Sequence, residues 1–163
     1  MRPSVVTQII DVYLVLFSHR DQAWKLADFG LTSEGGSEEF VTTELARGTP
    51  GYRAPELLMD GRYVFNKKVD MWAMGIILYE LAVGTKPFHS DAAVLEHFRS
   101  GTSLETPCDT LSEQGKLRIL NHVREMVHNT PSSRPTVALL VETFSRYLAE
   151  QLIGPVTQRN ESF

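Results

Sequence analysis

The chain has 163 residues, with 42% hydrophobic and 22% charged residues, which are ordinary values for one globular domain with its own core. The formal net charge of -4 argues against nucleic acid or an anionic membrane surface as a main partner. Cys108 is the single cysteine, so no internal disulfide can form. A reducing intracellular compartment, most simply the cytoplasm, is therefore expected.

Residues 1–12 form an uncertain N-terminal segment. The apolar stretch Val5–Phe17 follows a charged residue, as in a signal peptide, but Gln8 and Asp11 interrupt it and no small-residue cleavage site follows. It is also too short and too polar to span a bilayer. The pattern of Val5–Asp11 fits either a helix or a strand.

Residues 13–27 have the pattern of a β-hairpin. The segments Tyr13–Phe17 and Ala23–Ala27 are rich in strand-forming residues, and the polar residues 18–22 separate them. Residues 31–47 are rich in Gly, Ser, Thr and Glu with little periodicity, which predicts a loop.

The central part of the chain predicts two helices. Val69–Val83 is almost wholly apolar, so this helix is expected to lie in the core. Asn66 is a candidate N-cap and Gly84 a candidate stop. After a Pro-Phe break, Asp91–Arg99 reads as a short helix.

The C-terminal part continues the helical pattern. Apolar residues at helical spacing predict a helix over about Ser112–His128, and Asn129–Pro135 reads as a proline-rich turn. A final amphipathic helix follows, with Thr136 able to cap it. The polar tail 153–163 is expected to be disordered, and the fold class is mainly α.

Four motifs occur in a fixed order along the chain. Asp-Phe-Gly stands at 28–30, GTPGYRAPE at 48–56, VDMWAMG at 69–75 and PSSRPT at 131–136. Together they resemble the C-terminal lobe of a eukaryotic protein kinase over about residues 13–152. The resemblance implies a mainly helical lobe with a short β-hairpin before Asp-Phe-Gly, with the N-terminal β lobe absent from this chain.

The resemblance assigns a cofactor role to Asp28, whose carboxylate would hold Mg²⁺ against the phosphates of ATP. Phe29 would pack inward, and Gly30 would allow the sharp backbone turn of a switch. Without the surrounding motifs, Asp28 would read as a strand-end carboxylate that caps a turn.

The triplet Ala54, Pro55 and Glu56 closes the activation segment that the resemblance implies. Glu56 resembles the family glutamate that forms a buried ion pair, and Arg134 matches its partner. Asp70 resembles the aspartate that holds the backbone of the catalytic loop. An aspartate that favours a helix N-terminus explains Asp70 as well.

Thr49 lies in a loop that resembles the substrate-positioning loop of serine/threonine kinases, so Ser or Thr hydroxyls of proteins are the expected acceptors. Ser37, Thr42 and Thr43 are candidate phosphorylation sites in the activation segment, because added charge can order a loop. A solvated Ser/Thr-rich loop is the alternative for each of the three.

His19-Arg20-Asp21 looks like the catalytic triplet of kinases but fails the rest of that motif. The motif requires Asn five residues after Asp, and here Leu26 stands at that place. The predicted strand leaves no room for a loop around a phosphate, so Asp21 is read as a turn residue of the hairpin.

The sequence contains no glycine-rich loop, no strand lysine motif and no complete catalytic-loop motif. The first hypothesis is therefore a truncated serine/threonine kinase, inactive alone, whose parent uses ATP and Mg²⁺. The second is a non-catalytic interaction module that binds a kinase partner or substrates near Thr49–Arg53 and the helix 91–99. A third is a non-viable in-frame deletion.

An uncovered apolar surface is expected around Tyr13–Phe17 and Phe29. Such a surface predicts poor solubility and self-association.

Overall fold

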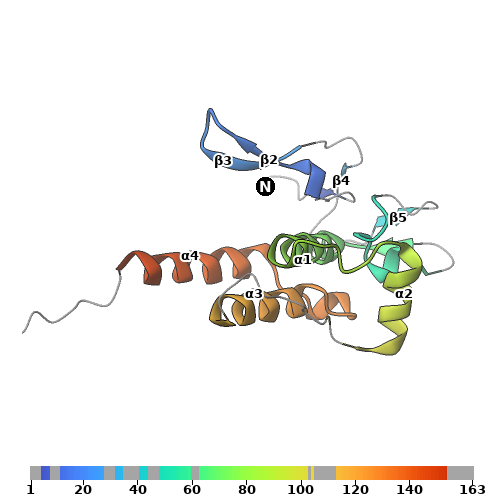
Figure 1. Cartoon of the computed structure of the whole chain (residues 1–163). Helices are drawn as coiled ribbons and strands as arrows, with labels where there is room; N and C mark the ends of the chain where they lie inside the picture. Colours follow the sequence, from blue (N-terminus) through green and yellow to red (C-terminus); the bar gives the residue numbers. More distant parts are fainter. Residues whose placement is uncertain are drawn as a thin grey trace, which may run out of the picture.

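A computed structural model describes residues 5–7, 12–27, 32–34, 41–43, 48–59, 63–102, 104 and 113–153. Most of these residues are helical, as the sequence predicted (Figure 1). The α-helices are α1 (Lys68–Val83), α2 (Asp91–Ser100), α3 (Glu113–Met126) and α4 (Val137–Ile153). Short 3₁₀ helices are η1 (Val12–Leu14), η2 (Pro55–Leu57) and η3 (Pro131–Ser133).

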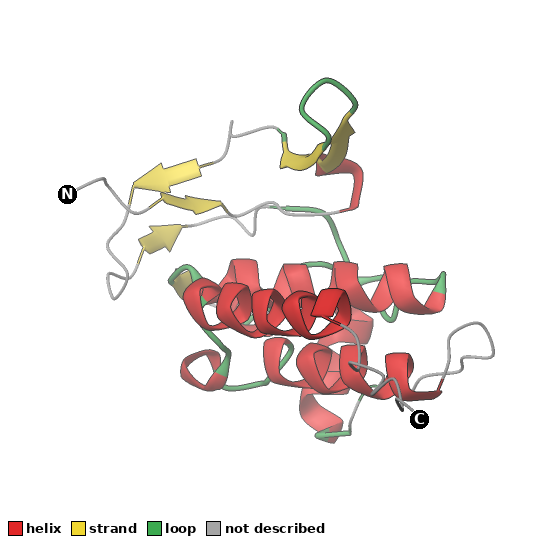
Figure 2. Cartoon of the chain, turned by 90° about the vertical axis from the view of Figure 1, so that its left-hand side faces the viewer, coloured by secondary structure: helices red, strands yellow, loops and turns green. Residues whose placement is uncertain are grey.

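The predicted hairpin is present. Strands β2 (Val15–Ser18) and β3 (Ala23–Leu26) are antiparallel, with Phe17 opposite Trp24. The hairpin lies apart from the helical body in Figures 1 and 2 and reaches the main core through Val15.

The prediction of a loop throughout residues 31–47 is wrong. Strand β4 (Thr32–Glu34) pairs with β1 (Val5–Thr7), and β5 (Val41–Thr43) pairs with β6 (Tyr63–Phe65), both antiparallel. Strands of three residues show little alternation, and each partner lies about twenty or more residues away. The pairing, rather than local propensity, makes these segments strands. The undecided segment 5–11 contributes β1.

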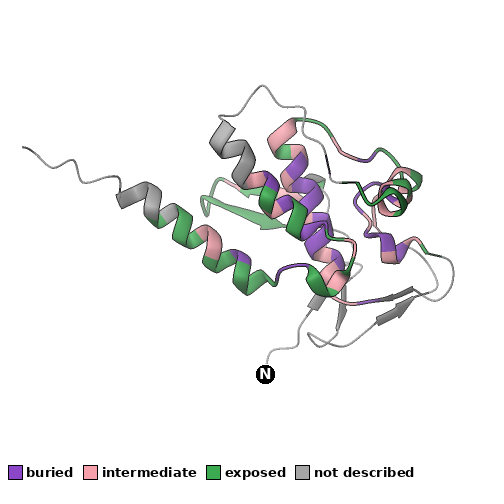
Figure 3. Cartoon of the chain, turned by 90° about the horizontal axis from the view of Figure 1, so that it is seen from below, coloured by how far each residue is buried: buried purple, intermediate pink, exposed green. Residues whose placement is uncertain are grey.

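Helix α1 lies at the centre of the hydrophobic core, as expected from its apolar composition. Its Trp72 and Ile76 are fully buried and belong to one cluster with Phe65, Phe88 and Val123. The cluster therefore joins α1 to a strand, to the segment before α2, and to α3 (Figure 3).

Gly75 allows α3 to pack close to α1. A Cβ atom at Gly75 would lie 2.9 Å from the Cβ of Met126 and 2.9 Å from Cγ1 of Val127. Both distances are shorter than carbon–carbon contact allows. The absence of a side chain at this position sets the separation of the two helices.

The helix ends follow the expected signals with one shift. Gly84 ends α1 with φ of 81°, and its N–H donates to the carbonyl of Glu80. The cap residue of α1 is Lys67 rather than Asn66, although Asn66 Oδ1 accepts a bond from the N–H of Lys68 at 3.0 Å.

The later helices keep close to their predicted bounds. Gly101, with φ of 63°, ends α2. The hydroxyl of Thr136 accepts a bond from the N–H of Leu139 at 3.2 Å and so caps α4. Helix α4 includes Ile153, so the predicted tail begins one residue too early, and residues 154–163 lie outside the described part. No helix in the described part has the length and apolar character to cross a membrane.

Candidate functional site

Glu56 and Arg134, which the sequence analysis paired, are in direct contact. Arg134 Nη1 lies 2.5 Å from Glu56 Oε1, and Nη2 lies 2.8 Å from Oε2. The Arg134 side chain has no exposed surface, and that of Glu56 is 16% exposed. The contact is therefore a two-pronged, largely buried ion pair between η2 and the segment before α4.

The Arg134 guanidinium also donates hydrogen bonds to two backbone carbonyls. Nε donates to the carbonyl of His128 at 2.9 Å, and Nη1 donates to the carbonyl of Lys68 at 2.9 Å. The guanidinium carbon lies 5.2 Å from the ring centre of Trp72. Lys68 in turn donates through Nζ to the carbonyls of Arg134 and Pro135. One buried cation thus joins η2, α1 and the turn after α3.

The loop 48–53 has two glycines in the left-handed region. Gly48 has φ of 100° and Gly51 has φ of 86°. A Cβ atom at Gly51 would lie 2.4 Å from the carbonyl oxygen of Phe88. Gly51 is therefore required both by its backbone angle and by this close approach.

The first residue of α2 holds the same loop. Asp91 Oδ2 lies 2.6 Å from Nη1 of Arg53, and Oδ1 accepts a bond from the N–H of Gly51 at 3.2 Å. Arg53 also donates through Nε to the carbonyl of Gly48 at 2.7 Å. The Arg53–Asp91 pair consequently fixes both ends of the loop against α2.

Tyr52 attaches the loop to α1. Its ring is buried, and its hydroxyl donates to Oε2 of Glu80 at 2.5 Å. The ammonium of Lys86 lies 4.4 Å from the centre of the ring, within the range of a cation–π interaction.

The structure also describes Thr49, Ala54, Pro55 and Asp70, which the sequence singled out. Thr49 is half-buried, and its carbonyl accepts a bond from the N–H of Tyr52 at 3.1 Å. Ala54 and Pro55 are buried at the start of η2. Asp70 lies half-buried in the first turn of α1. Its role towards a catalytic loop stays a prediction.

The remaining predicted residues are not brought into this site by the described structure. Asp28, Phe29, Gly30 and Ser37 lie outside the described residues. Thr42 and Thr43 belong to strand β5, opposite Val64 and Tyr63 of β6. These two candidate phosphorylation sites are therefore in a paired strand rather than in the free loop that the sequence suggested.

His19, Arg20 and Asp21 lie in the turn of the hairpin. Asp21 Oδ2 accepts a bond from the hydroxyl of Ser18 at 3.0 Å and also pairs with the ammonium of Lys25. Lys25 and, to a smaller extent, Ser18 lower the pKa of Asp21. Asp21 is a turn residue in this structure.

The expected uncovered apolar surface is present on the hairpin and is larger than expected. Tyr13 is 73% exposed, and Leu16 and Phe17 are exposed as well. Trp24, which is 70% exposed, and Leu26 on the opposite strand extend this surface beyond the predicted Tyr13–Phe17. Because Trp24 and Leu26 alternate with Lys25 in the predicted strand, the sequence already placed the two apolar side chains on one face.

Sequence reasoning also missed the contacts that hold the loop 48–53. Arg53 stands inside a quoted motif, yet no local pattern connects it with Asp91, which lies 38 residues further along the chain. The same holds for Tyr52 with Glu80. Only the fold brings these pairs together.

Comparisons with known proteins agree with this architecture. The family model described as protein kinase domain matches residues 14–145. The chain is 36% identical over 161 residues to a probable myosin light chain kinase of Dictyostelium discoideum, covering 98% of this chain and 31% of that protein. It is 43% identical over 72 residues to human protein kinase C delta type, covering 44% of this chain and 10% of that protein.

A protein kinase C of Drosophila melanogaster shows 45% identity over 67 residues, which is 41% of this chain and 9% of that protein. The chain thus spans less than a third of the curated relatives it matches. The family match covers most of the chain, and these relatives are named as a myosin light chain kinase and as forms of protein kinase C. The chain belongs to the protein kinase domain family, in its serine/threonine group.

Proposed function

We propose that this chain is the substrate-binding helical lobe of a serine/threonine protein kinase domain. The parent activity is the transfer of the γ-phosphate of ATP to a Ser or Thr hydroxyl of a protein. The observation that carries the proposal is the loop 48–53, which is fixed to α2 by Arg53 and Asp91 and to α1 by Tyr52 and Glu80. A loop held from two sides is suited to orienting a peptide.

The chain's own residues would act by positioning. Thr49 lies between two glycines in the left-handed region, and its carbonyl accepts a bond from the N–H of Tyr52, so its backbone is held at a defined place in the loop. The Glu56–Arg134 pair anchors the segment that follows the loop. Because these contacts exist before a substrate binds, less conformational entropy is lost on binding.

The family uses ATP and Mg²⁺, and Asp28 is the residue that we expect to hold the metal. Within the described part of the chain, no group of three His, Cys, Asp or Glu residues lies together in a way that could hold a metal ion. Asp21 is engaged by Lys25 and Ser18 in the hairpin turn. The described residues do not fit a complete Mg²⁺–ATP site, so we derive no catalytic step through one.

We further propose that the chain alone does not transfer phosphate, because positioning and electrostatic stabilisation of ATP make up most of kinase catalysis. The test incubates the purified chain with radiolabelled ATP, Mg²⁺ and casein. No transfer is expected from the wild type or from Asp28→Ala and Asp21→Ala. Transfer by the wild type that is lost in Asp28→Ala would contradict the inactivity. Phosphate transfer by the wild type that is lost only in Asp21→Ala would identify Asp21 as the catalytic aspartate.

A non-catalytic interaction module is the second candidate, and the exposed apolar surface of the hairpin favours it. Tyr13, Leu16 and Trp24 together present aromatic and aliphatic groups to solvent. Under this proposal the chain binds a kinase partner, or another copy of itself, through β2 and β3. Light scattering should show association that Leu16→Ser with Trp24→Ser reverses. A monomeric wild type at high concentration would count against self-association.

An intracellular, cytoplasmic location remains part of the proposal. It is supported by the single cysteine, which cannot form an internal disulfide. Fluorescence of the tagged chain in cells is the direct test. Secretion into the medium would be the contrary result.

A further inference from the structure

A pocket of about 370 Å³ lies between the second half of α2 and the two residues that follow η2. The described residues that line it are Leu58, Met59, Leu95, Phe98 and Arg99. Its volume is at the small end of the range for ligand sites, which suits one large side chain. Helix α2 lies at an edge of the helical body in Figure 1.

Most of the lining is apolar and is not used by the protein's own core. Leu95 and Phe98 are only half-buried and belong to neither hydrophobic cluster of the described residues. Met59 is 42% exposed. Leu58 packs against the main core and forms the inner wall. Three partly open apolar side chains around one pocket are an arrangement that marks protein contact sites.

Arg99 adds a positive charge to this pocket. It is exposed in the last turn of α2, and its side chain makes no hydrogen bond or ion pair with the described residues. No carboxylate lines the pocket in the described part of the chain, because the neighbouring acid on α2, Glu96, lies outside the lining. The pocket therefore combines apolar walls with one uncompensated cation. Phe, Met and Arg are also residue types enriched at protein interfaces.

The lining residues of α2 share a helix face with Asp91. Asp91, Leu95 and Phe98 stand at positions i, i+4 and i+7 of the helix. Asp91 holds the loop 48–53 through Arg53 and the N–H of Gly51. With a rise of 1.5 Å per residue, the far end of the pocket is about 12 Å along the helix from Asp91. One face of α2 thus holds the loop at its start and lines the pocket at its end.

We propose that this pocket is a docking site for a segment of a partner protein. The segment inserts one Leu or Phe side chain between Leu58, Leu95 and Phe98 and places a neighbouring Asp or Glu against Arg99. Charge complementarity selects this partner, since a basic segment would meet Arg99 with like charge. Docking requires neither ATP nor phosphate transfer. Its failure is therefore distinguishable from failure of the kinase proposal.

The test is an NMR titration of the full chain labelled with ¹³C-methyl methionine. The chain has five methionines, and the loss of one signal in Met59→Leu assigns the signal of Met59. The probe is the blocked peptide N-acetyl-Gly-Phe-Glu-Gly amide. We expect a dissociation constant on the order of 1 mM, as suits the burial of one side chain. The Met59 signal should shift, whereas the signals of Met71 and Met126, which are buried and do not line the pocket, should stay.

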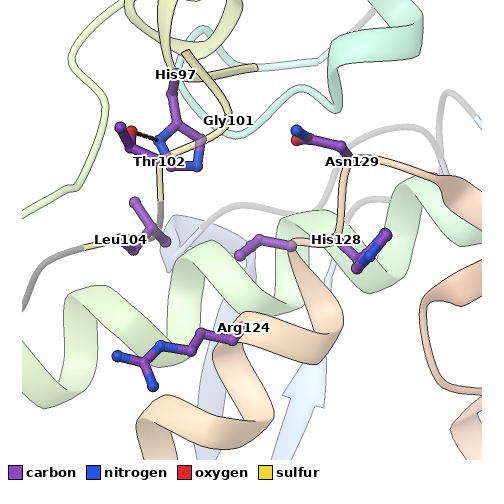
Figure 4. Close-up of a pocket in the computed structure, with 8 residues that line it drawn as sticks. His97, Gly101, Thr102, Leu104, Arg124, His128 and Asn129 are labelled. Carbon is purple, nitrogen blue, oxygen red and sulfur yellow. Dashed lines mark hydrogen bonds between the residues drawn. The ribbon is translucent and has the colours of Figure 1, made fainter. Parts of the chain in front are cut away.

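Variants of the chain and of the peptide test the two parts of the recognition. Arg99→Gln should weaken binding about threefold, as suits an exposed ion pair. The matched control is Arg124→Gln, because Arg124 is an exposed arginine of α3 that lines a separate pocket at the ends of α2 and α3 (Figure 4). It should leave binding unchanged. Replacing Phe of the peptide by Ser should abolish the shift, and replacing Glu by Lys should weaken binding more than Arg99→Gln does.

Each other outcome overturns the proposal. An equal shift with the Ser peptide would show that the apolar side chain is not recognised. Equal affinity for the Lys peptide, or equal weakening by Arg99→Gln and Arg124→Gln, would show that Arg99 does not select an acid. A titration that leaves the Met59 signal in place, or that moves all five signals alike, would show that the pocket is not the binding site. Unchanged spectra of both variants before titration ensure that lost binding is not lost folding.

Discussion

The buried ion pair between Glu56 and Arg134 gives the most direct test of how the activation segment is attached to the helical core. Glu56→Gln keeps the shape of the side chain but removes the charge and replaces one acceptor oxygen by an NH₂ group. One of the two contacts, at 2.5 Å and 2.8 Å, is then lost. The Arg134 guanidinium stays buried, with only the carbonyls of His128 and Lys68 and one oxygen of the amide as acceptors.

The expected cost follows from this geometry. Removing one partner of a buried pair costs ~3–5 kcal/mol, because the remaining charge is left without compensation. One hydrogen bond survives in Glu56→Gln, and the Glu56 side chain is 16% exposed. We therefore expect the lower limit, about 3 kcal/mol. Arg134→Met also removes the bonds to His128 and Lys68 and the contact with Trp72, so it should cost about 5 kcal/mol.

Urea denaturation followed by circular dichroism measures these changes. A domain of this kind has a free energy of unfolding of about 5–15 kcal/mol, so a loss of 3 kcal/mol is a large shift of the midpoint. The matched control is Glu142→Gln in α4, which removes a pair to Arg146 whose side chains are 66% and 68% exposed. That change should cost less than about 0.5 kcal/mol. If Glu56→Gln costs no more than Glu142→Gln, the reasoning about the buried pair is refuted.

Three further changes test other parts of the structure. Gly75→Ala adds a Cβ atom 2.9 Å from Met126 Cβ. Overpacking should lower the free energy of unfolding by about 1–3 kcal/mol, which outweighs the higher helix propensity of alanine. A raised melting temperature would contradict this. Asp91→Asn removes the charge that faces Arg53, so amide hydrogen exchange should speed up in the loop 48–53 while α3 keeps its protection. Unchanged exchange in the loop would show that the Arg53–Asp91 pair does not hold the loop. Burial lowers the pKa of His97 below 6.5, so the unfolded chain binds this proton more readily and stability should fall as the pH drops below 6.5. In urea unfolding at several pH values, His97→Asn should make the free energy of unfolding depend less on pH. If His97→Asn changes this pH dependence no more than the exposed control His89→Asn does, His97 is not its cause.

The parts of the fold that were predictable from the sequence depend on neighbours within a few residues. The apolar run of α1, its stop at Gly84 and the capping hydroxyl of Thr136 each act inside one or two helical turns. A local pattern therefore contains all the information that these features need. The β2–β3 hairpin is predictable for the same reason, because only four residues separate its strands.

The parts that were missed depend on partners far along the chain. Strand β5 forms because β6 lies beside it, and Asp91 meets Arg53 because α2 packs against η2. The members of the Glu56–Arg134 pair are even farther apart in sequence, at 78 positions. It was predictable because the family resemblance supplied the pairing, which no spacing rule in the chain could have done.

The triplet His19-Arg20-Asp21 shows why residue identity alone does not define a catalytic group. A catalytic aspartate must reach the proton of a substrate hydroxyl, and its carboxylate must be free to accept it. Asp21 instead accepts a bond from Ser18 and pairs with Lys25 across its own turn, and both contacts lower its pKa. The next strand begins at Ala23, which leaves no chain to surround a phosphate. The same three letters therefore belong to a turn here, and Asp21→Ala should loosen the hairpin because the contacts with Ser18 and Lys25 are lost.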